Sequence, residues 1–151
     1  MTTRATASIA VAGSASSRAF DMTRRRASVN AVKVRWCEWP VNESTLHDAG
    51  NYAASLAKLQ RFEEAKSLLR KTIPVARRVL GENNERTLRM RWIYARTLYE
   101  DPGATLDDLR ETLTTLEEIE PIARRVLGGA HPITVDIERD MRNARDAVEG
   151  G

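Results

Sequence analysis

The stretch Pro74-Val75-Ala76-Arg77-Arg78-Val79-Leu80-Gly81 decides the fold, because it recurs 47 residues later as Pro121-Ile122-Ala123-Arg124-Arg125-Val126-Leu127-Gly128. The same offset relates Thr87 to Thr134. A match of this length in one register indicates two tandem copies of a single structural unit.

A second block of matches extends the repeat upstream at an offset of 42 residues. Leu46, Tyr52, Ala53 and Leu56 recur as Leu88, Tyr94, Ala95 and Leu98. The two offsets differ by five residues, so an insertion of this length separates the two blocks. It falls at Asp101–Thr105, a turn-like segment that contains Pro and Gly. Thr105 followed by Asp108 then resembles the capping box that opens a helix.

Each unit has the apolar spacing of two helices. In unit one the predicted buried stripes are Leu46, Ala49, Tyr52, Ala53 and Leu56, then Phe62, Ala65, Leu68, Leu69, Ile73, Ala76, Val79 and Leu80. In unit two they are Leu88, Trp92, Tyr94, Ala95 and Leu98, then Leu106, Leu109, Leu113, Leu116, Ile119, Val126 and Leu127. Gly81 and Gly128 are predicted to end the second helices as glycine caps.

Pro74 and Pro121 fall inside these predicted helices at equivalent positions. Proline removes a backbone donor from a helix interior. Its recurrence predicts either a shared bend or a split helix, and the sequence leaves both open.

The sequence therefore predicts an all-α fold of tandem helical hairpins, a short right-handed α-solenoid over residues 44–148. Unit one spans 45–86, unit two 87–133, and a capping helix 134–148. That helix has an apolar face of Ile133, Ile137, Met141, Ala144 and Val148 and a solvated face of Asp136, Glu138, Arg139, Asp140, Arg142 and Asp146. The N-terminal end lacks such a cap, so we expect an apolar edge there, covered by residues 30–43, by self-association or by repeats of a longer array.

The repeat resembles the tetratricopeptide repeat, in the 42-residue form of kinesin light chains. The residues that carry the resemblance are Arg61-Phe62-Glu63-Glu64-Ala65, Arg77-Arg78-Val79-Leu80-Gly81 and the linker Gly129-Ala130-His131-Pro132-Ile133-Thr134. The chain departs from the family at Gln60, where glycine is usual, at Thr72, where alanine is usual, and in a first linker without His-Pro. The resemblance implies a non-catalytic scaffold that binds a peptide or partner helix in a concave groove lined by the first helix of each unit.

Carrying the groove positions over one by one gives His47, Gly50, Asn51, Ala54 and Lys58 in unit one, and Arg89, Trp92, Ile93, Arg96 and Tyr99 in unit two. Arg89, Trp92, Arg96 and Tyr99 follow one another at spacings of three, four and three, so they share one helical face. With Asn51 and Lys58 they are the candidate partner-binding residues. A stripe of guanidinium and aromatic groups suits an acidic linear peptide with an apolar anchor. The competing interpretation is that Trp92 packs between units and the arginines are ordinary surface residues.

Residues 1–43 differ from the rest of the 151-residue chain. They hold seven basic and three acidic residues, a net charge of +4, whereas residues 44–151 hold 17 basic and 18 acidic residues, a net charge of −1. We expect a disordered basic leader rich in Ala, Ser, Thr and Arg. The alternative function is a targeting or regulatory adaptor, in which the leader directs organelle import or is phosphorylated at Ser28, after Arg24-Arg25-Arg26.

The balanced charge of residues 44–151 argues against specific nucleic-acid binding, and no apolar run is long enough for a membrane span. One cysteine, Cys37, and two histidines, His47 and His131, leave few ligands for a metal. No phosphate-binding loop or nucleophile elbow is present, so we expect no enzyme activity and no cofactor. The expected localisation is cytoplasmic, with organelle import as the alternative.

Overall fold

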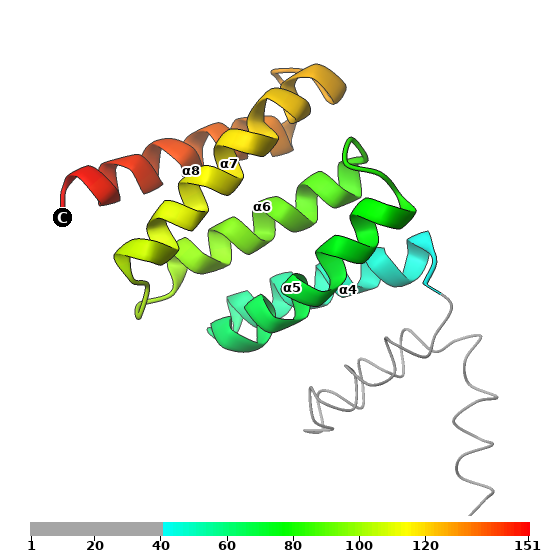
Figure 1. The fold of residues 1–151 in the computed structure, drawn as a ribbon, viewed down its shortest axis with the longest axis horizontal. Helices are drawn as coiled ribbons and strands as arrows, with labels where there is room; N and C mark the ends of the chain where they lie inside the picture. The colour runs from blue at the N-terminus through cyan, green and yellow to red at the C-terminus, as the bar shows by residue number, and fades with distance from the viewer. Residues whose placement is uncertain (1–40) are drawn as a thin grey trace, which may run out of the picture. The chain divides into compact units, whose positions relative to one another are not determined.

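Five α-helices follow one another along residues 41–151, which are the residues that the computed structural model describes (Figure 1). They are α4 (Glu43–Lys58), α5 (Phe62–Val79), α6 (Glu85–Glu100), α7 (Leu106–Val126) and α8 (Pro132–Glu149). Residues Asn42–Gly151 form one compact unit. The described part of the chain contains helices and no strands, so the all-α prediction is confirmed there.

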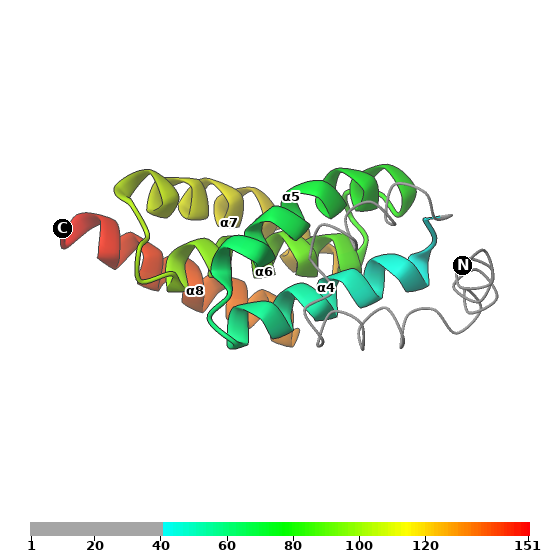
Figure 2. The same ribbon diagram turned by 90° about the horizontal axis from the view of Figure 1, so that it is seen from below.

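Helices adjacent in sequence pair as hairpins, α4 with α5 and α6 with α7. The second hairpin packs on the first through α6, which contacts both α4 and α5, and α8 then contacts both α7 and α6. Figure 2 shows α5 and α7 along one side of the unit and α4, α6 and α8 along the other. This is the two-layer arrangement of a helical solenoid, and it places the first helices of the units next to one another.

The two copies of the repeated octapeptide end in the same backbone conformation. Leu80 has φ −100° and ψ −24°, and Leu127 has φ −100° and ψ −25°. The glycines that follow, Gly81 and Gly128, have φ of 94° and 97°, the left-handed region that glycine adopts without a Cβ clash. The predicted glycine caps are confirmed. Pro74 and Pro121 each lie inside one continuous helix, which excludes the split that the sequence left open.

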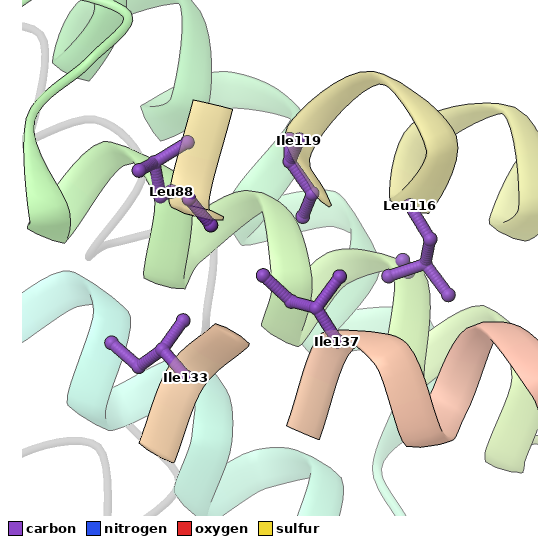
Figure 3. Packing of buried hydrophobic residues seen from close by; sticks show 7 residues of the cluster. Leu88, Leu116, Ile119, Ile133 and Ile137 are labelled. Atoms are coloured by element: carbon purple, nitrogen blue, oxygen red, sulfur yellow. The ribbon is translucent and has the colours of Figure 1, made fainter. Parts of the chain in front are cut away.

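The buried side chains follow the predicted stripes closely. One cluster joins α6, α7 and α8 and consists of Leu88, Ala95, Leu116, Ile119, Ala123, Ile133 and Ile137 (Figure 3). The prediction is wrong for Val79, Leu106 and Val126, which are 46%, 47% and 44% exposed. Leu106 is the first residue of α7. Val79 and Val126 are each the last residue of their helix, and the leucine one position later is half-buried instead, which leaves the valine on the solvent side.

The first and last helices, α4 and α8, have polar or exposed residues at positions where the equivalent residues of α6 are buried. On α8, Arg142 and Arg145 are exposed 47 residues after Ala95 and Leu98, which are buried against α7. The helix thus has the solvated face expected of a cap. On α4, Asp48 and Ser55 stand 42 residues before the buried Met90 and Thr97. These two positions of α4 are therefore polar, whereas their counterparts on α6 are buried. The expected apolar N-terminal edge stays a prediction.

The first helix begins at Glu43, the residue at which the leader was predicted to end. The Asn42 side chain caps α4 by accepting a hydrogen bond from the Thr45 amide, at 2.9 Å. Glu43 forms an ion pair with Arg86 on α6. Asn42 and Glu43 thus belong to the helical unit.

Polar side chains also join the hairpins. The Lys66 ammonium on α5 donates to Asp101 at the end of α6, at 2.8 Å. Burial of Lys66 favours its neutral form, but hydrogen bonds to Asp101 and Glu63 outweigh burial and raise its pKa. The same hydrogen bond from Lys66, with a second from the Gly103 amide, lowers the pKa of Asp101. The Tyr94 hydroxyl accepts from Arg70 on α5 at 2.9 Å and donates to Glu111 on α7 at 2.6 Å.

The loops are built as their residues predict, with one strained position. The turn Asp101–Thr105 precedes α7, and Thr105 and Asp108 form the reciprocal hydrogen bonds of a capping box. Backbone and hydroxyl hydrogen bonds from Thr105 lower the pKa of Asp108. Between α4 and α5, Gln60 has φ 60°, which makes it the one non-glycine residue with positive φ among residues 41–151. A side chain there costs about 1–2 kcal/mol.

Replacing Gln60 by glycine should therefore stabilise the protein. Removing the Cβ clash stabilises the folded protein by more than the extra conformational entropy of glycine stabilises the unfolded chain. The free energy of unfolding should therefore rise by about 0.5–1 kcal/mol. Urea unfolding of the wild type and Gln60→Gly measures it. Gln60→Ala, which keeps the Cβ, should give no gain, and a Gln60→Gly variant no more stable than the wild type would contradict the assignment of strain.

The Lys66–Asp101 pair should make stability depend on pH in acid. Because the pKa of Asp101 is lowered in the folded protein from its ordinary value of 3.8, its contribution is present above that value and is lost as the pH falls through the folded pKa. Asp101→Asn should cost about 1–2 kcal/mol at pH 7 and progressively less below pH 3.8.

Unfolding free energies measured across this pH range test the dependence. Asp107→Asn is the matched control, since Asp107 is exposed and contacts only Arg110, at 3.3 Å. If the difference in unfolding free energy between Asp101→Asn and the wild type is the same at pH 7 and in strong acid, the predicted pH dependence is refuted.

Candidate functional site

Most of α6 is enclosed by the other four helices, and only a narrow strip of it reaches solvent. Nine of its 16 residues are buried. From Arg89 onward, the residues that are not buried are Arg89, Trp92, Arg96, Tyr99 and Glu100. The first four are the residues that the sequence spacing placed on one face, and we call them the α6 strip. Their shared exposure agrees with that placement.

Within the strip, Trp92 and Arg96 lie against each other. The Arg96 guanidinium carbon is 5.8 Å from the centroid of the Trp92 ring, within the range of a cation–π contact. Arg96 also donates to Glu100 at 2.7 Å. This hydrogen bond is the largest cause that raises the pKa of Arg96, and the charges of Asp140 and Asp136 act in the same direction. Arg96 is thus a paired cation.

Trp92 also contacts the last helix. Its indole nitrogen donates to a carboxylate oxygen of Asp140 on α8 at 2.8 Å, and its ring packs against the core cluster shared by α6, α7 and α8. Asp140 is only 6% exposed, so the prediction that it lies on the solvated face of α8 is wrong. The repeat register contained the signal, because Asp140 stands 47 residues after Ile93, which is also buried.

Arg89 differs from the other arginines near the strip. It is exposed, and it forms no hydrogen bond or ion pair with any residue of the described chain. Arg86 pairs with Glu43, and Arg139 on α8 pairs with Asp136 at 2.7 Å. The positive charge available to a partner on α6 therefore lies at Arg89.

The neighbouring face of α4 is polar and less crowded. Asn51 and Lys58 are both exposed, and the Asn51 amide nitrogen lies 3.3 Å from His47 Nε2. Lys58 has no hydrogen-bond or ion-pair partner among residues 41–151. Gly50 is 42 residues before Trp92 and is buried, and a Cβ there would lie 3.3 Å from Met90 Cγ on α6. α4 and α6 thus approach closely at the position that Trp92 occupies one repeat later.

Two of the four arginines in the repeated Arg-Arg pairs bind acids of their own or adjacent segments. Arg77 pairs with Glu82, and Arg124 pairs with Glu120 and Glu138. Arg125 instead donates to Asn83, at 3.4 Å. His131 caps α8, its Nδ1 accepting from the Ile133 amide at 3.3 Å, as expected of a linker residue.

The described residues contain no group of three or more His, Cys, Asp or Glu side chains that could hold a metal ion. Within residues 41–151, no helix combines the length and hydropathy needed to cross a membrane. The predictions for Ser28, Cys37, the Arg24–Arg26 cluster and the rest of the basic leader up to residue 40 lie outside the described residues.

Tandem α-hairpins whose first helices lie side by side define a helical-repeat protein, a class that binds other proteins through extended surfaces. A family model described as "Tetratricopeptide repeat" matches residues 45–85, which span α4 and α5. Residues 45–85 thus contain a tetratricopeptide repeat, and this family is in general a non-catalytic module for protein interaction. Comparisons with curated proteins and with solved structures gave no match.

Proposed function

We propose that this chain binds an acidic linear peptide across the α6 strip and the exposed face of α4. Tetratricopeptide repeats bind proteins, and the first helices of the two units, which line the binding surface in this family, lie adjacent here. Asn51, Lys58 and the four strip residues are the proposed contacts. Partner identity, self-association, membership of a longer array, the kinesin-light-chain-like subtype and cytoplasmic localisation remain predictions.

The observation that carries the proposal is the distribution of paired and unpaired cations. Arg96 and Arg139 already bind acids, whereas Arg89 and Lys58 have no partner in residues 41–151. An exposed guanidinium without a partner can donate two hydrogen bonds to a peptide carboxylate in bidentate geometry without first breaking an ion pair. Arg89 is therefore the residue proposed to bind a peptide carboxylate. Arg96 instead lies against the Trp92 ring.

Trp92 supplies the apolar part of the proposed surface. It is half-buried, so its ring has both core contacts and solvent-accessible area. Tryptophan and arginine are the residues most enriched among those that dominate binding energy at protein interfaces. A peptide with one or two carboxylates near an aromatic or aliphatic side chain fits this pair.

Selection of a displayed random dodecapeptide library on the full-length chain tests the proposal. We expect the selected peptides to be enriched in Asp and Glu. Arg89→Glu should lower their affinity at least about tenfold, since it replaces an attractive charge by a repulsive one. The affinity of the wild type should fall with added salt.

Arg78→Glu is the matched control, because Arg78 is an exposed arginine on α5 with no hydrogen-bond or ion-pair partner in the described chain. It makes the same change of charge away from the strip and should leave affinity within about twofold. The proposal fails if no acidic peptide is selected, or if Arg89→Glu and Arg78→Glu have equal effects while both variants keep wild-type helicity.

A further inference from the structure

The contact between α6 and α8 contains a buried carboxylate that packing alone does not require. At the equivalent contact between α4 and α6, Gly50 stands in place of Trp92 and Ile93 stands in place of Asp140, with Ile93 only 7% exposed. An apolar residue therefore serves the stacking of first helices one repeat earlier. Burying a carboxylate instead costs solvation free energy, and a buried ion is weak evidence for a gain in stability.

The carboxylate is held by specific polar contacts. One oxygen of Asp140 accepts from the Trp92 indole nitrogen at 2.8 Å. The other lies 3.4 Å from Nε and Nη2 of Arg139, which is held in turn by Asp136 at 2.7 Å. Both oxygens are thus engaged, one by α6 and one by its own helix.

These contacts determine how Trp92 is presented on the strip. An indole ring in a partly open site has several rotamers, and a hydrogen bond from its one donor to a buried acceptor selects among them. Arg96 lies 5.8 Å from the ring centroid and is tied to Glu100. Trp92 therefore contacts both Asp140 on α8 and Arg96 on the strip.

We propose that Asp140 is a positioning residue for the peptide-binding surface, which fixes the Trp92 ring and through it Arg96 without itself touching the peptide. This rests on the proposed function above, because it assigns a role toward the same surface. It adds that α8, besides covering the core, determines the affinity of α6 for a peptide. Preorganising an aromatic anchor raises affinity by lowering the cost of ordering it on binding.

Substitutions at Asp140 in the full-length chain separate positioning from packing. Asp140→Asn keeps an acceptor oxygen for the indole and should bind the selected dodecapeptide within about twofold of the wild type. Asp140→Ile introduces the residue of the equivalent position 93, which is apolar, larger than aspartate and without the acceptor. It should weaken binding about tenfold while the helicity stays that of the wild type.

The Trp92 indole N–H resonance, assigned by its disappearance in Trp92→Phe, reports the hydrogen bond directly. We expect it to keep its position in Asp140→Asn and to shift in Asp140→Ile. Trp92→Phe removes the donor from the other side and should weaken peptide binding as Asp140→Ile does. The double variant should lose no more than either single one.

The outcomes distinguish the two proposals. If the wild type binds an acidic peptide through Arg89 but both Asp140→Ile and Trp92→Phe bind it as tightly as the wild type, the role of Asp140 is refuted and the proposed function stands. The same conclusion follows from Trp92→Phe alone if Asp140→Ile does not fold. If the wild type selects no acidic peptide, the proposed function fails and the role of Asp140 fails with it.

Discussion

The burial of α6 between the hairpin of α4 and α5 on one side and α7 and α8 on the other is the contact on which the rest of this structure depends. Each hairpin has an apolar side that it cannot cover alone, and α6 covers that of the first hairpin while α7 and α8 cover its own. Nine of its residues are consequently buried, including polar ones such as Thr87 and Arg91. Thr87 donates to the carbonyl of Ala76 on α5, and Arg91 binds Glu118 on α7, so even these side chains join neighbouring helices.

The same enclosure restricts where the chain can bind a partner. Because three sides of α6 are occupied, its remaining side chains form a single line, and their charges are balanced locally except at Arg89. A surface of this kind selects a ligand by the position of one charge relative to one aromatic ring. The first helix contributes small and polar side chains beside that line, which leaves α6 as the source of the larger contacts.

The sequence predicted those features that depend on local chemistry. Gly81 and Gly128 end their helices, and Thr105 and Asp108 cap the next one, because the conformational freedom of glycine and the reach of short polar side chains act over a few residues. The spacing of Arg89, Trp92, Arg96 and Tyr99 likewise fixes a shared helical face. The left-handed backbone of Gln60 was not predicted, although this residue stands where the family usually has glycine.

Features that depend on contacts between distant helices were not predicted. Asp140 is a charged residue on a helix with a clear polar face, and that pattern does not predict its hydrogen bond to the indole of Trp92, 48 residues away, although the repeat register marks its position as buried. The exposure of Val79 depends on where its helix ends relative to its neighbour, which hydrophobic spacing does not encode. The pairing of Arg96 with Glu100, at the ordinary i, i+4 spacing, was within reach of the sequence and separates it from Arg89.

Native-state amide hydrogen exchange, resolved by residue, tests most directly whether α6 is the element that the rest of the unit depends on. The account predicts that amides in the middle of α6 exchange only through global unfolding, while amides of α4 and α8, which lie at the two ends of the array, exchange through smaller openings of lower free energy. Exchange in α6 at the same low free energy as in α4 and α8 would contradict it, because a helix enclosed by the other four helices cannot open before the two at the ends.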